Sequence, residues 1–395
     1  MHKIKVQSVE SVIVDLPLKR LQRFSALGAE RQSVVVIMVR SFDGAIGIGE
    51  AVTPSGPWWS GESVESIKLH IDTYLAPLLI DQDAFELENL RRQMDLKVFG
   101  NSFAKAGLEM ALLDLIGKTI KQPVYNLFGG KVRDSLEVSW PLATGDADLE
   151  IAEAEEKLDQ RLHRSFKLKM GALPVEEDVA RACKVATALQ DRASVRADPN
   201  GMWNESTANW AIERMQAAGI ELVEQPLPRW DLDGSARLTR RFETEIMIDE
   251  GVCTIHDMVR VGQQRAAGTV SLKIMKSAGI RATKTVAEVA EAAGISTYMG
   301  TFLESSLGTA ANMQLCATFK HLPYGGELSG PLLLAEDLLT TAAEYRDFRL
   351  WLSAGDGLGA ELDVDKLAHF RRDRDRTVHA VTAPQKPSAK TSPSS

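Results

Sequence analysis

Five charged residues stand at the ends of short apolar runs, where acids and bases of these types could move protons beside a metal ion. They are Lys169, Asp198, Glu224, Asp249 and Lys273, and successive members lie 29, 26, 25 and 24 residues apart. One strand and one helix with their loops take about 30 residues. The spacing therefore predicts an acid or a base at the same point of each successive β/α unit.

The three carboxylates follow three consecutive predicted strands, which end near Asp198, Glu224 and Asp249. In a parallel β/α barrel the carboxyl ends of all strands face one mouth, so these side chains would converge and repel one another. A divalent cation removes that repulsion, and ligands that are all oxygen atoms favour Mg²⁺ or Mn²⁺. The alternative for each single carboxylate is that it caps the helix that follows it.

Two lysines alternate in the strand-like run Ser165–Gly171, and the period of a strand puts Lys167 and Lys169 on one face. We expect both to point into the barrel, where each charge lowers the pKa of the other toward the range useful for proton transfer. The alternative is a pair of surface lysines on an edge strand. Lys273 would lie across the barrel, so that lysines on the two sides could address opposite faces of one carbon atom.

Four further residues near the strand ends have more than one interpretation. Asn200 can face the same side as the first carboxylate and bind a ligand or the substrate, whereas Glu250 either points away or supports the site from outside. Lys276 either adds a positive charge or begins a solvated loop. Glu327, between glycines, is either a proton-relay partner of the last lysine or a turn residue. With its ion and lysines, the site would be positive and would suit a small dicarboxylate.

The elements that must position these residues alternate between strand-like runs and amphipathic helical windows from residue 136 onward. An open doubly wound sheet would place its ligand at one switch point rather than at five consecutive strand ends, so the pattern favours a barrel. A short segment, Gly325–Gly330, could close it irregularly. The expected strands are 136–143, 165–170, 193–198, 220–224, 245–249, 269–274 and 295–300.

The rest of the chain has a different organisation. In residues 1–130, strand-like runs precede helical windows, which predicts an α+β domain ahead of the barrel of residues 131–330. Residues 331–370 are too few for a third domain and are expected to pack back on the first. Residues 371–395 are charged and then rich in Pro, Ser, Thr and Lys, which is typical of a disordered tail.

The composition of the 395 residues, with 44% hydrophobic and 25% charged residues, is that of a soluble globular protein. A net charge of −8 argues against nucleic acid as the main partner. Cys183, Cys253 and Cys316 are too widely spaced for a disulfide framework, which indicates the cytoplasm. We see no secretory signal in the first residues and no apolar run long enough for a membrane span.

The two-lysine strand, the Asp/Glu/Asp series and the opposite lysine resemble the muconate-lactonizing subgroup of the enolase superfamily. The resemblance extends over nearly the whole chain, except the tail, and favours the cycloisomerase branch. The stretches that carry it are IVDLP (13–17), GIGEA (47–51), FAKAGLEMALLD (103–114), GGKVRDSLEVSW (129–140), FKLKMG (166–171) and GELSGPLLL (326–334).

The resemblance implies a capping α+β domain over a modified (β/α)₇β barrel, and a role for each residue of the series. The implied acid/base is Lys169, assisted by Lys167, with Lys273 on the opposite face of the substrate. The implied cofactor is Mn²⁺ or Mg²⁺, one ion per subunit, and the implied assembly is a homo-octamer. The implied metal ligands are Asp198, Glu224 and Asp249.

The implied reaction is the reversible lactonisation of cis,cis-muconate to muconolactone in aromatic degradation by the β-ketoadipate route. One carboxylate of the substrate adds across the conjugated double bond, the metal ion stabilises the resulting enolate, and Lys169 protonates the α carbon. Capping loops near 18–28 and 53–61 would close over the substrate, and the adjacent Trp58 and Trp59 of the second loop either cover the ligand or anchor that loop.

Alternatives on the same site remain open. Pro199 stands where the resemblance leads us to expect a β-branched residue. Because this difference lies within the series of site residues, chloromuconate and methylmuconate remain alternative substrates. Dipeptide epimerase and N-succinylamino acid racemase are alternative activities, because each would use lysines on both faces.

Overall fold

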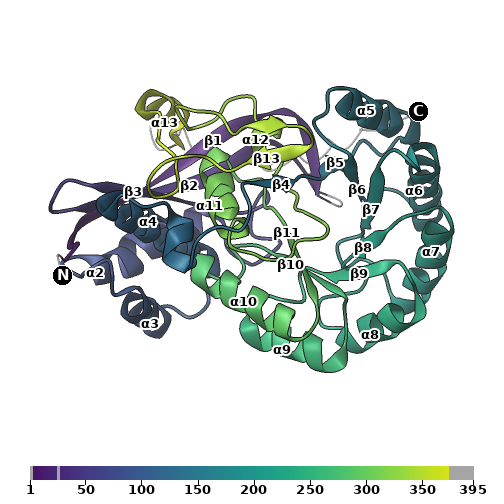
Figure 1. The fold of residues 1–395 in the computed structure, drawn as a ribbon, viewed down its shortest axis with the longest axis horizontal. Coiled ribbons are helices and arrows are strands. Elements are labelled where there is room, and N and C mark those ends of the chain that lie inside the picture. The colour runs from purple at the N-terminus through teal and green to yellow at the C-terminus, as the bar shows by residue number, and fades with distance from the viewer. Residues whose placement is uncertain (1–2, 25–26, 373–395) are drawn as a thin grey trace, which may run out of the picture.

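The computed structural model describes residues 3–24 and 27–372. Its N-terminal part is an antiparallel sheet in the order β1, β2, β3, with helices packed against it (Figure 1). The elements of this part are β1 (Val6–Phe24), β2 (Leu27–Ser41), β3 (Ile46–Val52), α1 (Val64–His70), η1 (Ile71–Leu75), α2 (Ala76–Leu79), α3 (Leu87–Lys97), α4 (Ser102–Ile120) and η2 (Val124–Phe128).

Two glycines of β3 allow helix α4 to lie directly on this sheet. A Cβ atom at Gly47 would be 2.1 Å from the carbonyl oxygen of Ala111, and one at Gly49 would be 2.3 Å from that of Gly107. A side chain at either position would therefore push the helix away. The close contact with β3 buries nearly the whole of α4.

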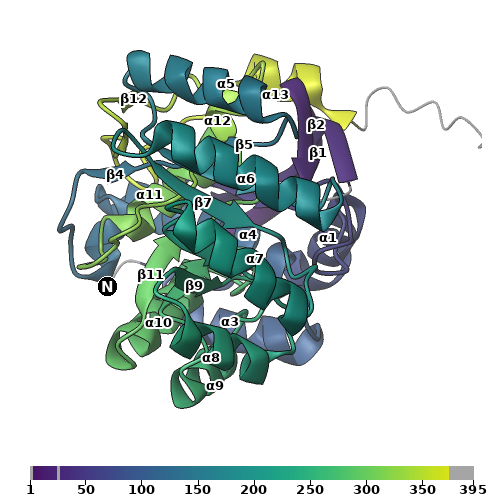
Figure 2. The same ribbon diagram turned by 90° about the vertical axis from the view of Figure 1, so that its right-hand side faces the viewer.

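The second part contains seven parallel strands in the sequential order β5 to β11. Their connecting helices lie around the outside of the curved sheet (Figures 1 and 2). The strands are β5 (Trp140–Leu142), β6 (Ser165–Lys169), β7 (Ser194–Asp198), β8 (Leu222–Glu224), β9 (Glu245–Ile248), β10 (Thr269–Leu272) and β11 (Ser296–Met299). The helices are α5 (Ala147–Asp159), α6 (Val175–Leu189), α7 (Glu205–Ala217), α8 (Leu232–Arg241), α9 (Ile255–Gln264), α10 (Ile280–Ala292) and α11 (Ser306–Cys316).

The predicted first strand, 136–143, is wrong as a single element. It is divided into β4 (Ser135–Glu137) and β5, and only β5 joins the barrel. The physical reason lies at the C-terminal end of the chain, where β13 (Arg349–Trp351) pairs antiparallel with β4 and forms a separate sheet with β12 (Tyr345–Arg346).

Gly326 joins the two ends of the barrel sheet, as expected for the segment 325–330. It forms parallel bridges to Val138, next to β5, and to Met299 at the end of β11. A Cβ atom at Gly326 would be 2.8 Å from the carbonyl oxygen of Met299, so the close approach requires glycine. The fold is therefore the predicted α/β class, a β/α barrel with a separate antiparallel sheet domain.

The C-terminal segment returns to the first sheet through α12 (Gly330–Leu333) and α13 (Val364–Phe370). Bridges join Leu18 to Leu334 and Val14 to Arg371. The expected tail lies outside the described residues from 373 onward, and the predicted domain bounds at 130, 330 and 370 stay predictions. No helix in the described residues is long and apolar enough to cross a membrane.

Candidate active site

The structure brings the five residues of the series to one end of the barrel. Lys169, Asp198 and Glu224 are the last residues of β6, β7 and β8. Asp249 directly follows β9, and Lys273 directly follows β10. The carboxyl ends of parallel strands lie at the same edge, so each short apolar strand delivers one charged side chain to the barrel mouth.

Lys167 and Lys169 both point into the barrel, as their spacing predicts. The Nζ atom of Lys167 lies 2.5 Å from Oε2 of Glu224 and 2.6 Å from Oε2 of Glu327. The Nζ atom of Lys169 lies 2.9 Å from Oδ2 of Asp198 and 3.6 Å from Oε1 of Glu327. Glu327 is therefore a buried partner of these two lysines, and neither of its two expected interpretations describes that contact.

The prediction that the pKa of these lysines falls toward the range useful for proton transfer is wrong, although Lys167 does act to lower the pKa of Lys169. Burial lowers the pKa of Lys167, but the charges of Glu224 and Glu327 outweigh burial and raise that pKa well above its usual value. The pKa of Lys169 is raised in the same way, against burial, by Asp198 and Glu327. The reason is that each ammonium lies within 2.9 Å of a carboxylate oxygen, and an opposite charge at that distance favours the protonated lysine.

Asp249 pairs with two lysines, Lys273 and Lys276, on the side of the barrel mouth opposite Lys167 and Lys169. Its Oδ2 atom lies 2.6 Å from Nζ of Lys273, and its Oδ1 atom lies 2.7 Å from Nζ of Lys276. Lys276 also donates to the carbonyl oxygen of Ser271 at 2.6 Å, so it is buried rather than part of a solvated loop. Burial raises the pKa of Asp249, but the two ammonium groups outweigh it and hold that pKa far below its usual value.

Asn200 links two carboxylates beside this wall. Its amide nitrogen lies 3.4 Å from Oδ2 of Asp198 and donates a 3.2 Å hydrogen bond to Oε1 of Glu250. Glu250 is buried, and burial together with the charges of Asp249 and Asp198 raises its pKa to about 8. Glu250 therefore lies beside the site. Pro199 stands immediately after β7, where its missing N–H breaks no strand pairing.

The donor set at the mouth fits a hard divalent cation, although each carboxylate is held by a lysine. Asp198, Glu224 and Asp249 are each 1% exposed. Among the described residues, no three Asp, Glu, His or Cys side chains converge closely enough to form a ready metal cage. Burial and the two neighbouring aspartates nevertheless raise the pKa of Glu224 to about 7 against the effect of Lys167. Oxygen ligands with this excess of negative charge are those that Mg²⁺ and Mn²⁺ prefer.

Aromatic side chains cover the mouth. Trp59 is 5% exposed, and its ring lies 4.8 Å from that of Phe302, measured between centroids. The Nζ atom of Lys273 lies 4.4 Å from the Phe302 centroid and 5.5 Å from that of Trp59. Trp59 therefore covers the site, whereas Trp58 is 39% exposed and donates to the carbonyl of Pro54.

Sequence reasoning missed several residues that line the small cavity of about 40 Å³ under this cover. They include Gln22 of β1 and Thr301, Phe302 and Leu303 of the loop after β11. That loop follows a predicted strand of the barrel, so its position in the chain could have indicated that it lies at the barrel mouth. Phe302 was missed because it carries no charge and the prediction considered only charged residues.

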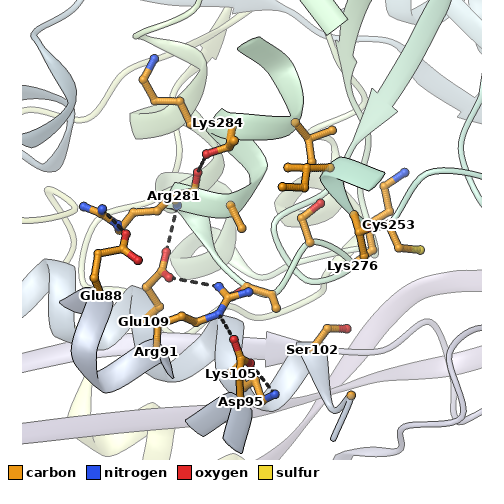
Figure 3. A pocket seen from close by; sticks show the side chains of 18 of the residues that line it. Glu88, Arg91, Asp95, Ser102, Lys105, Glu109, Cys253, Lys276, Arg281 and Lys284 are labelled. Atoms are coloured by element: carbon orange, nitrogen blue, oxygen red, sulfur yellow. Dashed lines mark hydrogen bonds and ion pairs between the residues drawn. The ribbon is translucent and has the colours of Figure 1, made fainter. Parts of the chain in front are cut away.

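A larger cavity of about 720 Å³ lies outside the barrel, between α3, α4 and the start of α10 (Figure 3). Its charged side chains bind one another. Asp95 lies 3.2 Å from Nε of Arg91 and 2.7 Å from Nζ of Lys105, and Glu88 pairs with Arg281. The barrel mouth is the better candidate site, because successive strands deliver buried charged side chains to it.

Comparison with known proteins identifies the family of both parts of the chain. Residues 8–129 match the N-terminal domain family of mandelate racemase and muconate lactonizing enzyme, and residues 150–366 match the family described as enolase C-terminal domain-like. A chloromuconate cycloisomerase of Cupriavidus pinatubonensis is 50% identical, over 94% of this chain and 100% of the relative.

Muconate cycloisomerase 1 of Pseudomonas putida is 43% identical, again over 94% of this chain and 100% of the relative. A crystal structure of muconate lactonizing enzyme from Pseudomonas fluorescens, complexed with muconolactone, superposes with a TM-score of 0.92 at 44% identity. It covers 94% of this chain and 100% of that structure.

Proposed function

Since the chain belongs to the family of mandelate racemase and muconate lactonizing enzyme, we propose that it closes cis,cis-muconate to muconolactone as an intramolecular lyase. The observation that carries this proposal is the arrangement at the barrel mouth. Three buried carboxylates lie between a lysine wall from β6 and a second lysine wall that follows β10. Such a site can hold a dianion and exchange one proton with it.

Lys169 is the proton donor in this proposal. A carboxylate oxygen of muconate forms a C–O bond to the conjugated diene, and the displaced π electrons move toward the second carboxylate. The α carbon then takes a proton from Nζ of Lys169, so the lactone monoanion carries one proton more than the muconate dianion, and Lys169 regains its proton from water. Glu327 and Lys167 hold Lys169 from behind, and Lys273 stabilises negative charge from the opposite face.

Enzymes of this family use a divalent metal ion. We assign Asp198, Glu224 and Asp249 as its ligands and Mn²⁺ or Mg²⁺ as the ion, one per subunit. When bound, the ion would stabilise the negative charge that develops on the second carboxylate of the substrate. The lysines that lie against these carboxylates, Lys169 and Lys273, would face the substrate beside the ion. Asn200, which donates to Asp198 and Glu250, orients this side of the site.

Two features beyond the site remain part of the proposal. The homo-octamer rests on the resemblance of the chain to its family. A cytoplasmic location is supported by the three cysteines, Cys183, Cys253 and Cys316, which are all free thiols. A small dicarboxylate is the expected partner.

The test follows the ultraviolet absorbance of the conjugated diene, which lactonisation removes. Purified enzyme with Mn²⁺ should remove the absorbance of cis,cis-muconate. 3-Chloromuconate is the second candidate substrate, because a chloromuconate cycloisomerase is 50% identical. Comparing kcat/KM for the two substrates, with methylmuconate and a dipeptide in the same panel, ranks the alternatives. If no muconate is consumed, the lactonisation proposal is wrong.

A further inference from the structure

Gln32 is a buried polar residue to which the proposed reaction gives no role. It lies in β2 and is 0% exposed. Its amide nitrogen donates two hydrogen bonds of 3.2 Å, one to the carbonyl oxygen of Thr53 and one to that of Phe302. Thr53 begins the capping loop that leaves β3, and Phe302 lies in the barrel loop that follows β11. One amide group thus joins two loops that are far apart in the sequence.

The hydrogen bonds fix the direction of this amide. Its oxygen, Oε1, is buried and has no hydrogen-bond partner among residues 3–24 and 27–372. Turning the amide would direct that oxygen at two carbonyl oxygens, so only the nitrogen can face the loops. A buried oxygen without a partner weakens a fold. Stability alone therefore does not account for a glutamine at this position.

The barrel loop needs an external tie because it turns sharply. Leu303 has a φ of +61°, in the left-handed region that leucine disfavours. The carbonyl that Gln32 holds belongs to the residue directly before this turn. On the other side of the loop, Oε1 of Glu304 accepts a 3.0 Å hydrogen bond from the N–H of Phe302. Gln32 and Glu304 therefore hold the same short turn from opposite sides.

The two loops that Gln32 joins each supply one aromatic ring to the cover of the site. The rings of Trp59 and Phe302 lie 4.8 Å apart between centroids, and the ammonium of Lys273 lies against both. A cation over an aromatic face is attracted to it, most strongly when water is excluded. A shift of either loop would change the surroundings of Lys273 and the walls of the cavity.

We propose that Gln32 is a positioning residue that holds the capping loop 53–61 and the barrel loop 300–305 in their closed arrangement over the substrate. This inference rests on the proposed function, because that function assigns Lys273 and the cavity to lactonisation. Without the tie, the closed arrangement is less populated, and apparent substrate affinity falls by the same factor. Saturating substrate restores closure, so KM rises while kcat changes little.

The substitution that tests this is Gln32→Met, which keeps the length of the side chain and removes both donors. Its matched control is Gln314→Met. Gln314 is also 0% exposed, and it links the N–H of Tyr125 at 3.0 Å and the carbonyl of Leu358 at 3.2 Å, both outside the cavity. We expect KM for cis,cis-muconate to rise about tenfold in Gln32→Met, with kcat within about twofold, as loss of ordinary hydrogen bonds would give.

Amide hydrogen exchange gives a readout that does not depend on turnover. Exchange across residues 53–61 and 300–305 should become faster in Gln32→Met and remain unchanged in Gln314→Met. An unchanged KM in Gln32→Met, or an equal rise in both variants, would overturn the proposal. If Gln32→Met does not fold, Gln32→Asn takes its place, because its amide is one methylene too short to reach both loops.

A double-mutant cycle provides the second measurement. If Gln32 acts through the aromatic cover, Gln32→Met should raise KM much less when Phe302→Leu has already removed one ring. Fully additive effects would contradict the proposal. If the wild-type enzyme consumes no muconate, the proposed function fails, and hydrogen exchange alone then decides whether Gln32 holds the two loops.

Discussion

Two clusters of carboxylates in this molecule, one at the barrel mouth and one around Glu50, balance their charge differently. At the barrel mouth, each of the three proposed ligands lies within 2.9 Å of a lysine ammonium. In the second cluster, Glu50 of β3 meets Glu304 and Asp337 at the N-terminus of α11. Glu50 accepts a 3.0 Å hydrogen bond from the N–H of Ser305 and a short one from its hydroxyl, and Asp337 accepts from Ser306.

The charged groups around Asp249 and Glu50 determine whether each of these two carboxylates is protonated. Two ammonium groups hold the pKa of Asp249 far below its usual value despite burial. Burial, with the charges of Glu304 and Asp337, raises the pKa of Glu50 to about 8, although the hydrogen bonds from Ser305 oppose the rise. Asp249 in the first cluster is therefore ionised, whereas Glu50 in the second keeps its proton near pH 7, at the joint between the two domains. Burial of acids alone does not identify a site.

The largest expected effect comes from removing one ammonium group at the barrel mouth. Lys169→Met should lower kcat for muconate by on the order of 10³- to 10⁴-fold, because the α carbon loses its proton donor. Loss of diene absorbance measures the rate, and circular dichroism checks that the variant folds.

The control for this change is Lys184→Met. Lys184 lies on the surface, where its ammonium pairs with Asp148 at 2.7 Å, so its loss should leave kcat unchanged. Retention of more than about a tenth of the wild-type kcat in Lys169→Met would show that another group donates the proton.

The second cluster should instead govern how stability depends on pH. Glu50 keeps its proton in the folded state up to about pH 8, whereas a glutamate in the unfolded chain loses it near 4.5. The folded state therefore binds more protons in this window, and the free energy of unfolding falls as pH rises through it. The difference between the two pKa values corresponds to about 5 kcal/mol at most.

Urea denaturation of wild type and Glu50→Gln at pH 5 and pH 8.5 measures this loss. The amide cannot ionise, so the variant should become more stable relative to wild type at the higher pH. Glu205→Gln, which changes a carboxylate paired with Arg237 near the surface, should show no such relative gain. Parallel pH profiles for wild type and Glu50→Gln would mean that Glu50 is already ionised near pH 5.

The difference between the clusters also explains what the sequence could predict. The barrel strands and their charged ends recur with a nearly constant spacing, and local periodicity determines most of them. Strand β7, expected over 193–198, spans Ser194–Asp198. The division of the first predicted strand could not be seen, because it depends on pairing with β13 near the end of the chain.

Contacts between distant residues account for the remaining failures. The sequence showed that Lys167 and Lys169 share a face but not that Glu327 lies near both, so the predicted direction of their pKa was wrong. Lys276 was ambiguous for the same reason. The second cluster was missed entirely, since nothing near Glu50 in the sequence indicates that the start of α11 will meet it.

The smallest expected effect is on metal affinity, and a matched pair of substitutions, one in each cluster, tests it. Asp249→Asn and Glu50→Gln both replace a buried carboxylate by an amide of the same shape. Only the first removes a proposed metal ligand, so it should weaken Mn²⁺ binding by at least the roughly 10- to 100-fold that loss of a supporting group near a metal causes. Titration calorimetry measures this affinity in both variants.

Glu50→Gln should bind Mn²⁺ as wild type does, because its cluster contributes no ligand. Asp249→Asn also leaves Lys273 and Lys276 without their closest carboxylate, so its folding must be verified at the pH of the titration. Unchanged Mn²⁺ affinity in a folded Asp249→Asn would disprove the ligand assignment. An equal loss of Mn²⁺ affinity in both variants would show that the two clusters are coupled through the fold. The distinction between a metal-binding cluster and a structural cluster would then be wrong.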